Sequence, residues 1–182
     1  LDKEGTATIA FLASGIEGLK IRITAKGDSE ESVNKILEAE AVKVADAIGN
    51  EIIFSRDDES MEATIIQLCR SQDLSLGLAE SMTGGFIASR ITSQPGSSDV
   101  FKGGIIPYST DIKQSILKVS EGPVISKAAV EQMAKGACTI LNCDVSVAVS
   151  GNAGPTASED EVGRVWMATS VDGIVESFTV KW

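Results

Sequence analysis

The sequence predicts an α/β protein: a three-layer α/β/α domain with a mostly parallel, mixed sheet, preceded by a small α+β domain. From residue 60 onward, stretches with helical periodicity alternate with short apolar runs, which is the element order of a sheet covered by helices on both faces. Residues 144–149 are rich in valine, as buried parallel strands tend to be. Residues before 57 instead give two strand-like runs and one long helix. We therefore expect one domain at residues 1–56 and a second at 57–182.

The first domain should begin with a β-hairpin. Residues 6–13 and 19–25 alternate as strands do, and a short loop with Gly15 and Gly18 joins them. A helix then starts at Asp28 or Ser29 and ends at Gly49. Residues 51–54 predict a further short strand, and the acidic run 57–59 marks the boundary. The apolar face of the helix consists of Val33, Ile36, Leu37, Val44, Ala45 and Ile48.

The second domain is predicted to alternate helices and strands. A helix at 61–72 leads into an apolar run at 74–78, and a second helix begins at Phe86. After a loop at 94–98 we expect a strand at 103–108, a helix at 111–117, and a helix at 127–141 capped by Ser126. A strand at 144–149 then runs into a glycine-rich loop at 151–155, and Asp172 and Gly173 predict a hairpin between strands 164–171 and 174–182.

The turn between the 74–78 strand and the Phe86 helix is the first candidate site. The first N–H groups of a helix lack partners within the helix, so an anion such as a phosphate is favoured there. Gly84 and Gly85 let a ligand approach the backbone. Ser81 would present its hydroxyl at this position as a nucleophile. The alternative is that Ser81 or Thr83 only caps the helix.

Three loops follow predicted strands, at residues 80–85, 108–113 and 150–155, and the carboxyl ends of parallel strands meet at one edge of a sheet. Lys113 is the candidate base, because a neutral lysine away from water can deprotonate a serine; the alternative is a solvated surface lysine. Tyr108 could relay the proton, or be a core tyrosine with a satisfied hydroxyl. Asn152 and the surrounding glycines could hold ribose or phosphate, or form only a turn.

Composition narrows the function classes. The 182-residue chain has no histidine, which excludes a Ser-His-Asp triad and a histidine metal site, so we expect neither metal nor cofactor. The net charge of −10 argues against a nucleic-acid or anionic membrane partner and favours a small molecule. Cys69, Cys138 and Cys143 are expected to be reduced core thiols. No apolar run or leader pattern indicates a membrane segment, so we expect a cytoplasmic protein.

Four motifs, in this order, resemble the C-terminal domain of the CinA (competence/damage-inducible) family over residues 60–171. They are the Ala79-Glu80-Ser81-Met82-Thr83-Gly84-Gly85 run; Pro95-Gly96-Ser97-Ser98 with Val100-Phe101 and Gly103-Gly104; Tyr108-Ser109 with Lys113; and Gly151 with Ala153-Gly154-Pro155. Residues 1–56 resemble the KH-like middle segment of full-length CinA proteins. The departures are Met82 for the usual cysteine, Thr110 for asparagine, Asn152, an acidic 158–161 segment, and no last helix after Trp182.

The resemblance implies an amidohydrolase that converts nicotinamide mononucleotide to nicotinate mononucleotide and ammonia, with Ser81, Tyr108 and Lys113 as the catalytic residues. The alternative is a catalytically degenerate nucleotide-binding or interaction module of the same fold. The exposed edge of the last strand, 174–182, could pair with a second copy in a homodimer. The implied substrate contacts are Glu80, Thr83, Gly84 and Gly85 in the first loop, Ser109 in the second, and Gly151, Asn152, Ala153 and Gly154 in the third.

Overall fold

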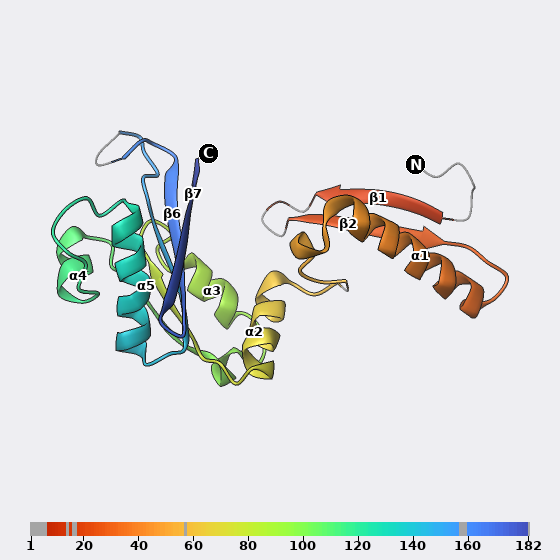
Figure 1. The fold of residues 1–182 in the computed structure, drawn as a ribbon, viewed down its shortest axis with the longest axis horizontal. Helices are drawn as coiled ribbons and strands as arrows, with labels where there is room; N and C mark the ends of the chain where they lie inside the picture. Colours follow the sequence, from red (N-terminus) through yellow and green to blue (C-terminus); the bar gives the residue numbers. More distant parts are fainter. Residues whose placement is uncertain (1–6, 14, 16–17, 57, 157–159, 182) are drawn as a thin grey trace. The chain divides into compact units, whose positions relative to one another are not determined.

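The computed structural model describes residues 7–13, 15, 18–56, 58–156 and 160–181. The chain forms two compact units, Leu1–Thr64 and Ile65–Trp182, which are coloured red to orange and yellow to blue in Figure 1. Helix α2 (Met61–Ser71) crosses the division between them. The predicted domain boundary at residue 56 and the KH-like character of the first segment stay predictions.

The first unit contains a β-hairpin and a long helix. Strands β1 (Ala7–Ala13) and β2 (Leu19–Ala25) pair antiparallel, as predicted. Helix α1 (Glu30–Ile48) begins where the Ser29 hydroxyl accepts a hydrogen bond from the Ser32 N–H, and ends at Gly49 with φ 94°.

The strand predicted at residues 51–54 is wrong. Residues Asn50–Ile52 form a 3-10 helix, η2, in its place. The Ile52 N–H donates to the Gly49 carbonyl and the Ile53 N–H donates to the Asn50 carbonyl. These local turns use the donors that a strand would have offered to a neighbouring strand.

The second unit is built on a five-stranded mixed sheet. Its strands are β3 (Leu76–Glu80), β4 (Phe101–Ile105), β5 (Val145–Gly151), β6 (Arg164–Val171) and β7 (Ile174–Lys181), in the order β4-β3-β5-β6-β7. Strands β4, β3 and β5 are parallel, and β6 and β7 continue the sheet antiparallel. The strand predicted at 103–108 lies earlier because Pro107 has no N–H to offer to a ladder, and Tyr108 N–H donates locally to Ile106.

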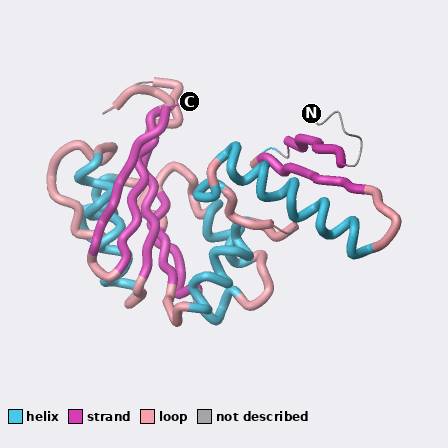
Figure 2. Tube along the Cα trace, turned by 45° about the vertical axis from the view of Figure 1, so that its right-hand side comes forward, coloured by secondary structure: helices cyan, strands magenta, loops and turns pink. Residues whose placement is uncertain are grey.

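Helices cover both faces of this sheet, so the three-layer prediction for the second unit is confirmed (Figures 1 and 2). On one face, α5 (Lys127–Leu141) and the segment after α4 (Thr110–Ser115) pack against Ala79, Ala148 and Ala168. On the other face, α2 and α3 (Phe86–Thr92) pack against Leu76 and Leu78. A short 3-10 helix, η3 (Ser97–Asp99), precedes β4.

Buried serines fix β5 against the elements that cover it. The Ser146 hydroxyl donates to the Ala134 carbonyl of α5 at 2.7 Å, and the Ser150 hydroxyl donates to the Val124 carbonyl at 2.9 Å. Both serines are fully buried. Because a buried hydroxyl is costly unless it is hydrogen-bonded, these two contacts hold α5 and the segment before it against β5.

Candidate functional site

The three predicted loops meet at one edge of the sheet. Strand β3 is flanked by β4 on one side and β5 on the other, both parallel to it. The Ser81 N–H continues this ladder by donating to the Val149 carbonyl at 3.0 Å. The segments that follow the three strands carry Ser81, Lys113 and Asn152, and they therefore leave the sheet at the same edge, as connectivity predicted.

Strand β3 holds Ser81 firmly because every residue of the strand is buried. Leu76 and Leu78 face one core while Ala79 faces the other, so the strand cannot slip by one residue without exposing its apolar side chains. Ser81 itself is 5% exposed. The serine thus lies on the rigid central strand of the parallel group, just below the surface.

Glu80 organises the turn that follows. Its side chain is 1% exposed, and its carboxylate accepts hydrogen bonds from the N–H groups of Gly85 (3.2 Å), Ile87 (3.0 Å) and Ala88 (2.7 Å). These are the groups at the start of α3 that were expected to attract a ligand phosphate. That expectation is wrong for this helix start, because the protein supplies its own anion there.

The glycines of the turn allow this arrangement. Gly84 and Gly85 have φ values of 61° and 95°, in the left-handed region that other residues adopt only with strain. A Cβ on Gly85 would also lie 2.9 Å from Ile106 Cδ1 on the loop after β4, whereas Gly84 faces open space. Gly85 therefore allows the loop after β3 to pack closely against the loop after β4. Gly84 leaves open space at the surface.

Thr83 and its neighbour offer polar groups that the turn does not use. The Thr83 hydroxyl oxygen is buried and has no hydrogen-bond partner in the described part of the chain. Within the same ranges, the backbone N–H groups of Met82 and Thr83 make no hydrogen bond. Buried polar groups are nearly always paired in proteins, so this turn keeps donors that a ligand oxygen can use.

Lys113 lies in α4, and only 3% of it is exposed. The alternative of a solvated surface lysine is therefore wrong. The main chain around it is fixed: its N–H donates to Ser109, and its carbonyl accepts from Leu117 and Val119. The Lys113 side chain is therefore held away from bulk water on a fixed main chain.

Sequence reasoning missed a glycine that packs against the segment just after this lysine. Gly136 of α5 is in contact with the backbone just after α4: a Cβ there would lie 2.4 Å from the Leu117 carbonyl oxygen. Leu117 is itself 1% exposed. A glycine inside a helix costs stability relative to alanine, so a mid-helix glycine facing an apolar stretch was the available signal for close backbone packing.

Tyr108 is exposed, unlike Ser81 and Lys113. Its side chain is 72% exposed, which also makes the core-tyrosine alternative wrong. Pro107 before it is buried and fixes the loop. The exposed Ser109 next to it hydrogen-bonds the Asp111 carboxyl and holds the pKa of that group below its usual value. The structure thus buries two of the three predicted catalytic side chains and leaves the third in solvent.

The third loop is anchored mainly by its own contacts. The Asn152 amide donates to the carbonyls of Thr156 (3.2 Å) and Asp160 (2.9 Å), and its oxygen accepts from Gly154 N–H (2.9 Å). Gly151 is needed because a Cβ would lie 2.8 Å from the Arg164 carbonyl oxygen. These contacts favour the turn interpretation for Asn152, while Ala153 is exposed at the edge of the loop.

A cluster of charged and aromatic side chains closes the far end of this loop, and sequence reasoning did not anticipate it. The Trp166 indole N–H donates to Asp160 at 3.2 Å, and Arg164 contacts both Asp160 (3.1 Å) and Glu161 (3.2 Å). Lys181 also pairs with Glu161. Lys181 and Arg164 together hold the pKa of the Glu161 carboxyl below its usual value. Arg164 of β6 and Lys181 of β7 therefore neutralise part of the negative charge of the acidic segment.

Across the described residues, no three His, Cys, Asp or Glu side chains gather closely enough to hold a metal ion. Among the helices of the described ranges, none has both the length and the apolar character that a membrane crossing requires.

Comparison with curated proteins places the chain among CinA-like sequences. A "CinA-like protein" of Thermotoga neapolitana is 34% identical over 153 residues, covering 81% of this chain and 36% of that protein. A "putative competence-damage inducible protein" of Halothermothrix orenii is 36% identical, covering 96% of this chain and 44% of that protein. The chain thus spans about two fifths of the length of these relatives.

Solved structures give the same result for the fold. The competence/damage inducible protein CihA of Agrobacterium tumefaciens is 33% identical with a TM-score of 0.63, covering 66% of this chain and 78% of that one. A CinA superfamily protein of Escherichia coli is 27% identical with a TM-score of 0.66, covering 74% and 85%. The family model described as the CinA C-terminal domain matches residues 58–182, well over half of the sequence. The β3 turn and the α4 lysine fall within that match, and the chain belongs to the CinA family.

Proposed function

We propose that the second unit is an amidohydrolase that converts nicotinamide mononucleotide to nicotinate mononucleotide and ammonia. One observation carries the proposal: Ser81 and Lys113 are both nearly fully buried, on segments that leave adjacent parallel strands at the same sheet edge. A base and a nucleophile that are held away from bulk water on fixed segments are what a serine–lysine mechanism requires. The family and the motif around Ser81 support the choice of an amide-bearing nucleotide as the substrate.

The mechanism follows from the groups present. Lys113, acting as a neutral amine, takes the proton of the Ser81 hydroxyl, and the Ser81 oxygen attacks the carboxamide carbon of the substrate. The unused N–H groups of Met82 and Thr83 stabilise the resulting oxyanion. The C–N bond breaks, the nitrogen takes the proton from Lys113, and ammonia leaves. Water then attacks the acyl-enzyme, which releases the carboxylate product and restores Ser81.

The predicted substrate contacts divide into two groups. Glu80, Asn152 and Gly154 have polar atoms that already bond the turn and the loop. Gly85 and Gly151 allow close packing there, so we assign all five residues to shaping those segments. Thr83, Gly84, Ser109 and Ala153 have unused or exposed groups at the same edge, and we assign the direct contacts to them. Exposed Tyr108 would reach the substrate from the solvent side of the site.

The test is ammonia release from nicotinamide mononucleotide by the purified chain, followed with a coupled assay. The expected result is turnover that a Ser81→Ala variant lacks. Absence of turnover in a folded wild-type chain would contradict the proposal for this chain.

The exposure of Tyr108 favours a second candidate, a nucleotide-binding module that no longer turns substrate over. In that case the wild-type chain should bind nicotinamide mononucleotide in a calorimetric titration and release no ammonia, and Ser81→Ala should bind equally well. Turnover by the wild-type chain would exclude this candidate.

A further inference from the structure

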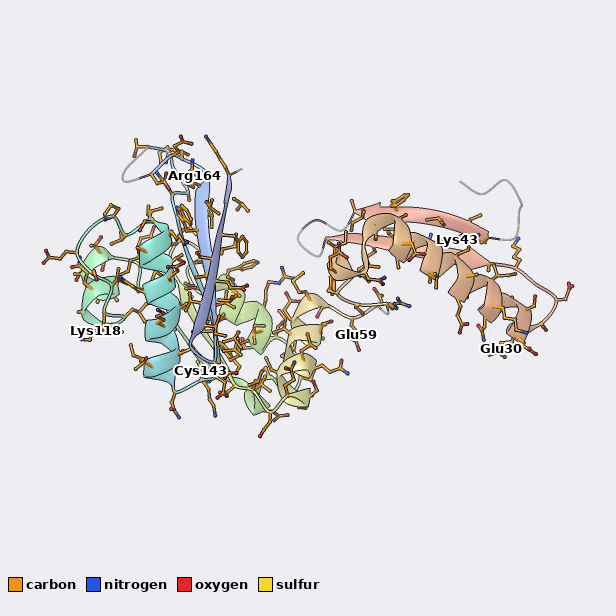
Figure 3. All side chains as sticks on the ribbon, viewed as in Figure 1. Glu30, Lys43, Glu59, Lys118, Cys143 and Arg164 are labelled. Carbon is orange, nitrogen blue, oxygen red and sulfur yellow. The ribbon has the colours of Figure 1, made fainter. Side chains whose placement is uncertain are left out.

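Two of the three cysteines meet at the sheet edge opposite Ser81. Cys138 lies in the last turns of α5, and Cys143 comes just before β5. Asn142 between them ends the helix with φ 47°, and the Cys143 N–H donates to the Cys138 carbonyl at 3.1 Å. In Figure 3, Cys143 lies at the end of the sheet away from Arg164, whose strand begins near the Ser81 edge.

The two thiols border the same cavity and are partly exposed. The Cys138 thiol donates to the Ser170 carbonyl at 4.0 Å, and both cysteines are only half-buried. They line a cavity of about 470 Å³ together with Lys135, Ser170 and Asp172. The expectation that all three cysteines are core thiols is therefore confirmed for Cys69, which is buried, and wrong for this pair.

We propose that Cys138 and Cys143 form a dithiol site that small-molecule disulfides entering this cavity oxidise to an intramolecular disulfide. The helix end supplies the geometry, because its backbone hydrogen bond holds the two residues next to each other across the turn, as a disulfide requires. Only four residues separate them, so closing the ring restricts the unfolded chain little. Such a bond contributes less to stability than a disulfide that closes a long loop, which suits a reversible modification.

The thiol–disulfide exchange takes place in two steps. The Cys138 thiolate, its proton having passed to water, attacks one sulfur of the small disulfide, breaks its S–S bond and releases one small thiolate. The Cys143 thiol then loses its proton to water, and its sulfur attacks the Cys138 sulfur and releases the second thiolate. Two protein thiols are oxidised and one small disulfide is reduced to two thiols.

The order of the two steps follows from the surroundings of Cys143. Burial and the neighbouring Cys138 raise the pKa of Cys143 to about 12. This disfavours the Cys143 thiolate, so Cys138 attacks first in the proposed sequence. A mixed disulfide on Cys138 cannot carry a charge. It removes the part of the shift that the Cys138 charge causes, and this favours the resolving step.

Gly77, which is far from the two cysteines in the sequence, also helps to keep Cys143 near Cys138. A Cβ on Gly77 of β3 would lie 2.6 Å from Cys143 Sγ, so the thiol rests directly on the backbone of that strand. The nearest acceptor to its sulfur is the Ala137 carbonyl at 4.0 Å. The Cys143 thiol is therefore covered by β3 on one side and lies beside the end of α5. Cys138, at that helix end, is the thiol with which it can react.

The test uses the full chain, first reduced and then incubated with oxidised glutathione, with mass spectrometry of the intact protein and of its peptides. The expected product has lost two hydrogen atoms, carries no glutathione, and yields a cross-linked peptide with Cys138 and Cys143. Cys143→Ala should instead accumulate one glutathione on Cys138. Cys69→Ala is the matched control and should form the internal disulfide as the wild type does.

Two results would overturn the proposal. One is a wild-type chain that accumulates glutathione on Cys138 or Cys143 without forming the internal bond. The other is a folded chain in which neither thiol reacts, while the urea-unfolded chain reacts fully under the same conditions. Circular dichroism of each variant establishes that the comparison is made between folded proteins.

Discussion

At the scale of single residues, the proposed function depends on Ser81 and Lys113, which are both buried. Ser81→Ala removes the proposed nucleophile and replaces a 5% exposed side chain with one of smaller size. We predict a loss in kcat on the order of 10³ or more, with an unchanged unfolding midpoint. Ser89→Ala, an exposed serine of α3, is the control and should keep full activity. Near-wild-type turnover in a folded Ser81→Ala chain would exclude Ser81 as the nucleophile.

The role of Lys113 as a base can be tested separately from its positive charge. A guanidinium stays protonated and cannot act as a base, so Lys113→Arg should lose activity by roughly 10²–10⁴-fold, and Lys113→Met, which keeps the bulk without the amine, should lose as much. Lys118→Arg, on the exposed neighbour of the same segment, should be fully active. Wild-type activity should rise with pH along one limb, because the neutral amine is the acting form. An active Lys113→Arg enzyme would leave the binding module as the better proposal.

At the scale of elements, α3 depends on a side chain that precedes it. Glu80→Ala would leave three N–H groups at the start of α3 without their acceptor. Hydrogen bonds to charged groups contribute about 1.5–3 kcal/mol each, so the free energy of unfolding should fall by about 3 kcal/mol or more. Glu80→Gln keeps one acceptor oxygen and should lose less. Urea titration measures both, with exposed Glu121→Ala as the control. A change in Glu80→Ala no larger than in the control would show that the capping contacts contribute little.

The starts of β3 and β5 are joined by Asp144. Its carboxylate accepts from the Ser75 hydroxyl (2.6 Å) and the Ser75 N–H (2.8 Å), which hold its pKa below the usual value. A carboxyl group with a depressed pKa in the folded state stabilises the fold above its unfolded pKa of about 3.9. That contribution is lost as the pH falls through the folded value. Asp144→Asn should therefore be less stable than the wild type at neutral pH, and the difference in urea midpoint should narrow below about pH 4. A difference that stays constant on acidification would contradict this assignment.

At the scale of the whole molecule, the second unit has its own core. Both apolar clusters consist only of residues from 65 onward, and Ser60 caps α2 through the Ala63 N–H at 3.2 Å. We predict that a 60–182 fragment folds alone, unfolds cooperatively in urea, and keeps the wild-type rate of ammonia release. A fragment that is unfolded by circular dichroism would show that residues 1–59 support the second sheet.

The sequence alone determined the order of elements and the edge at which the site forms. Apolar periodicity, Ser29 and Ser126 as helix caps, and the Asp172-Gly173 turn are local signals, and each reproduced its element closely. The connectivity of β4, β3 and β5 then required Ser81, Lys113 and Asn152 to share one edge, because parallel strands end together. The prediction of a strand at residues 51–54 was wrong because a short apolar segment is compatible with a turn as well as with a strand.

Only the tertiary structure decided which polar groups are already satisfied. The Glu80 carboxylate meets backbone groups up to Ala88, and the Asn152 amide reaches Asp160; these pairings depend on how the chain folds back after each turn, and no sequence spacing specifies them. The burial of a side chain also depends on how distant parts of the chain fold against it. Lys113 is buried, whereas Tyr108, five residues earlier, stays in solvent, and Gly136 lets α5 approach the backbone at Leu117. Exposure is a property of what packs against a side chain, and that is set by residues far away in the sequence.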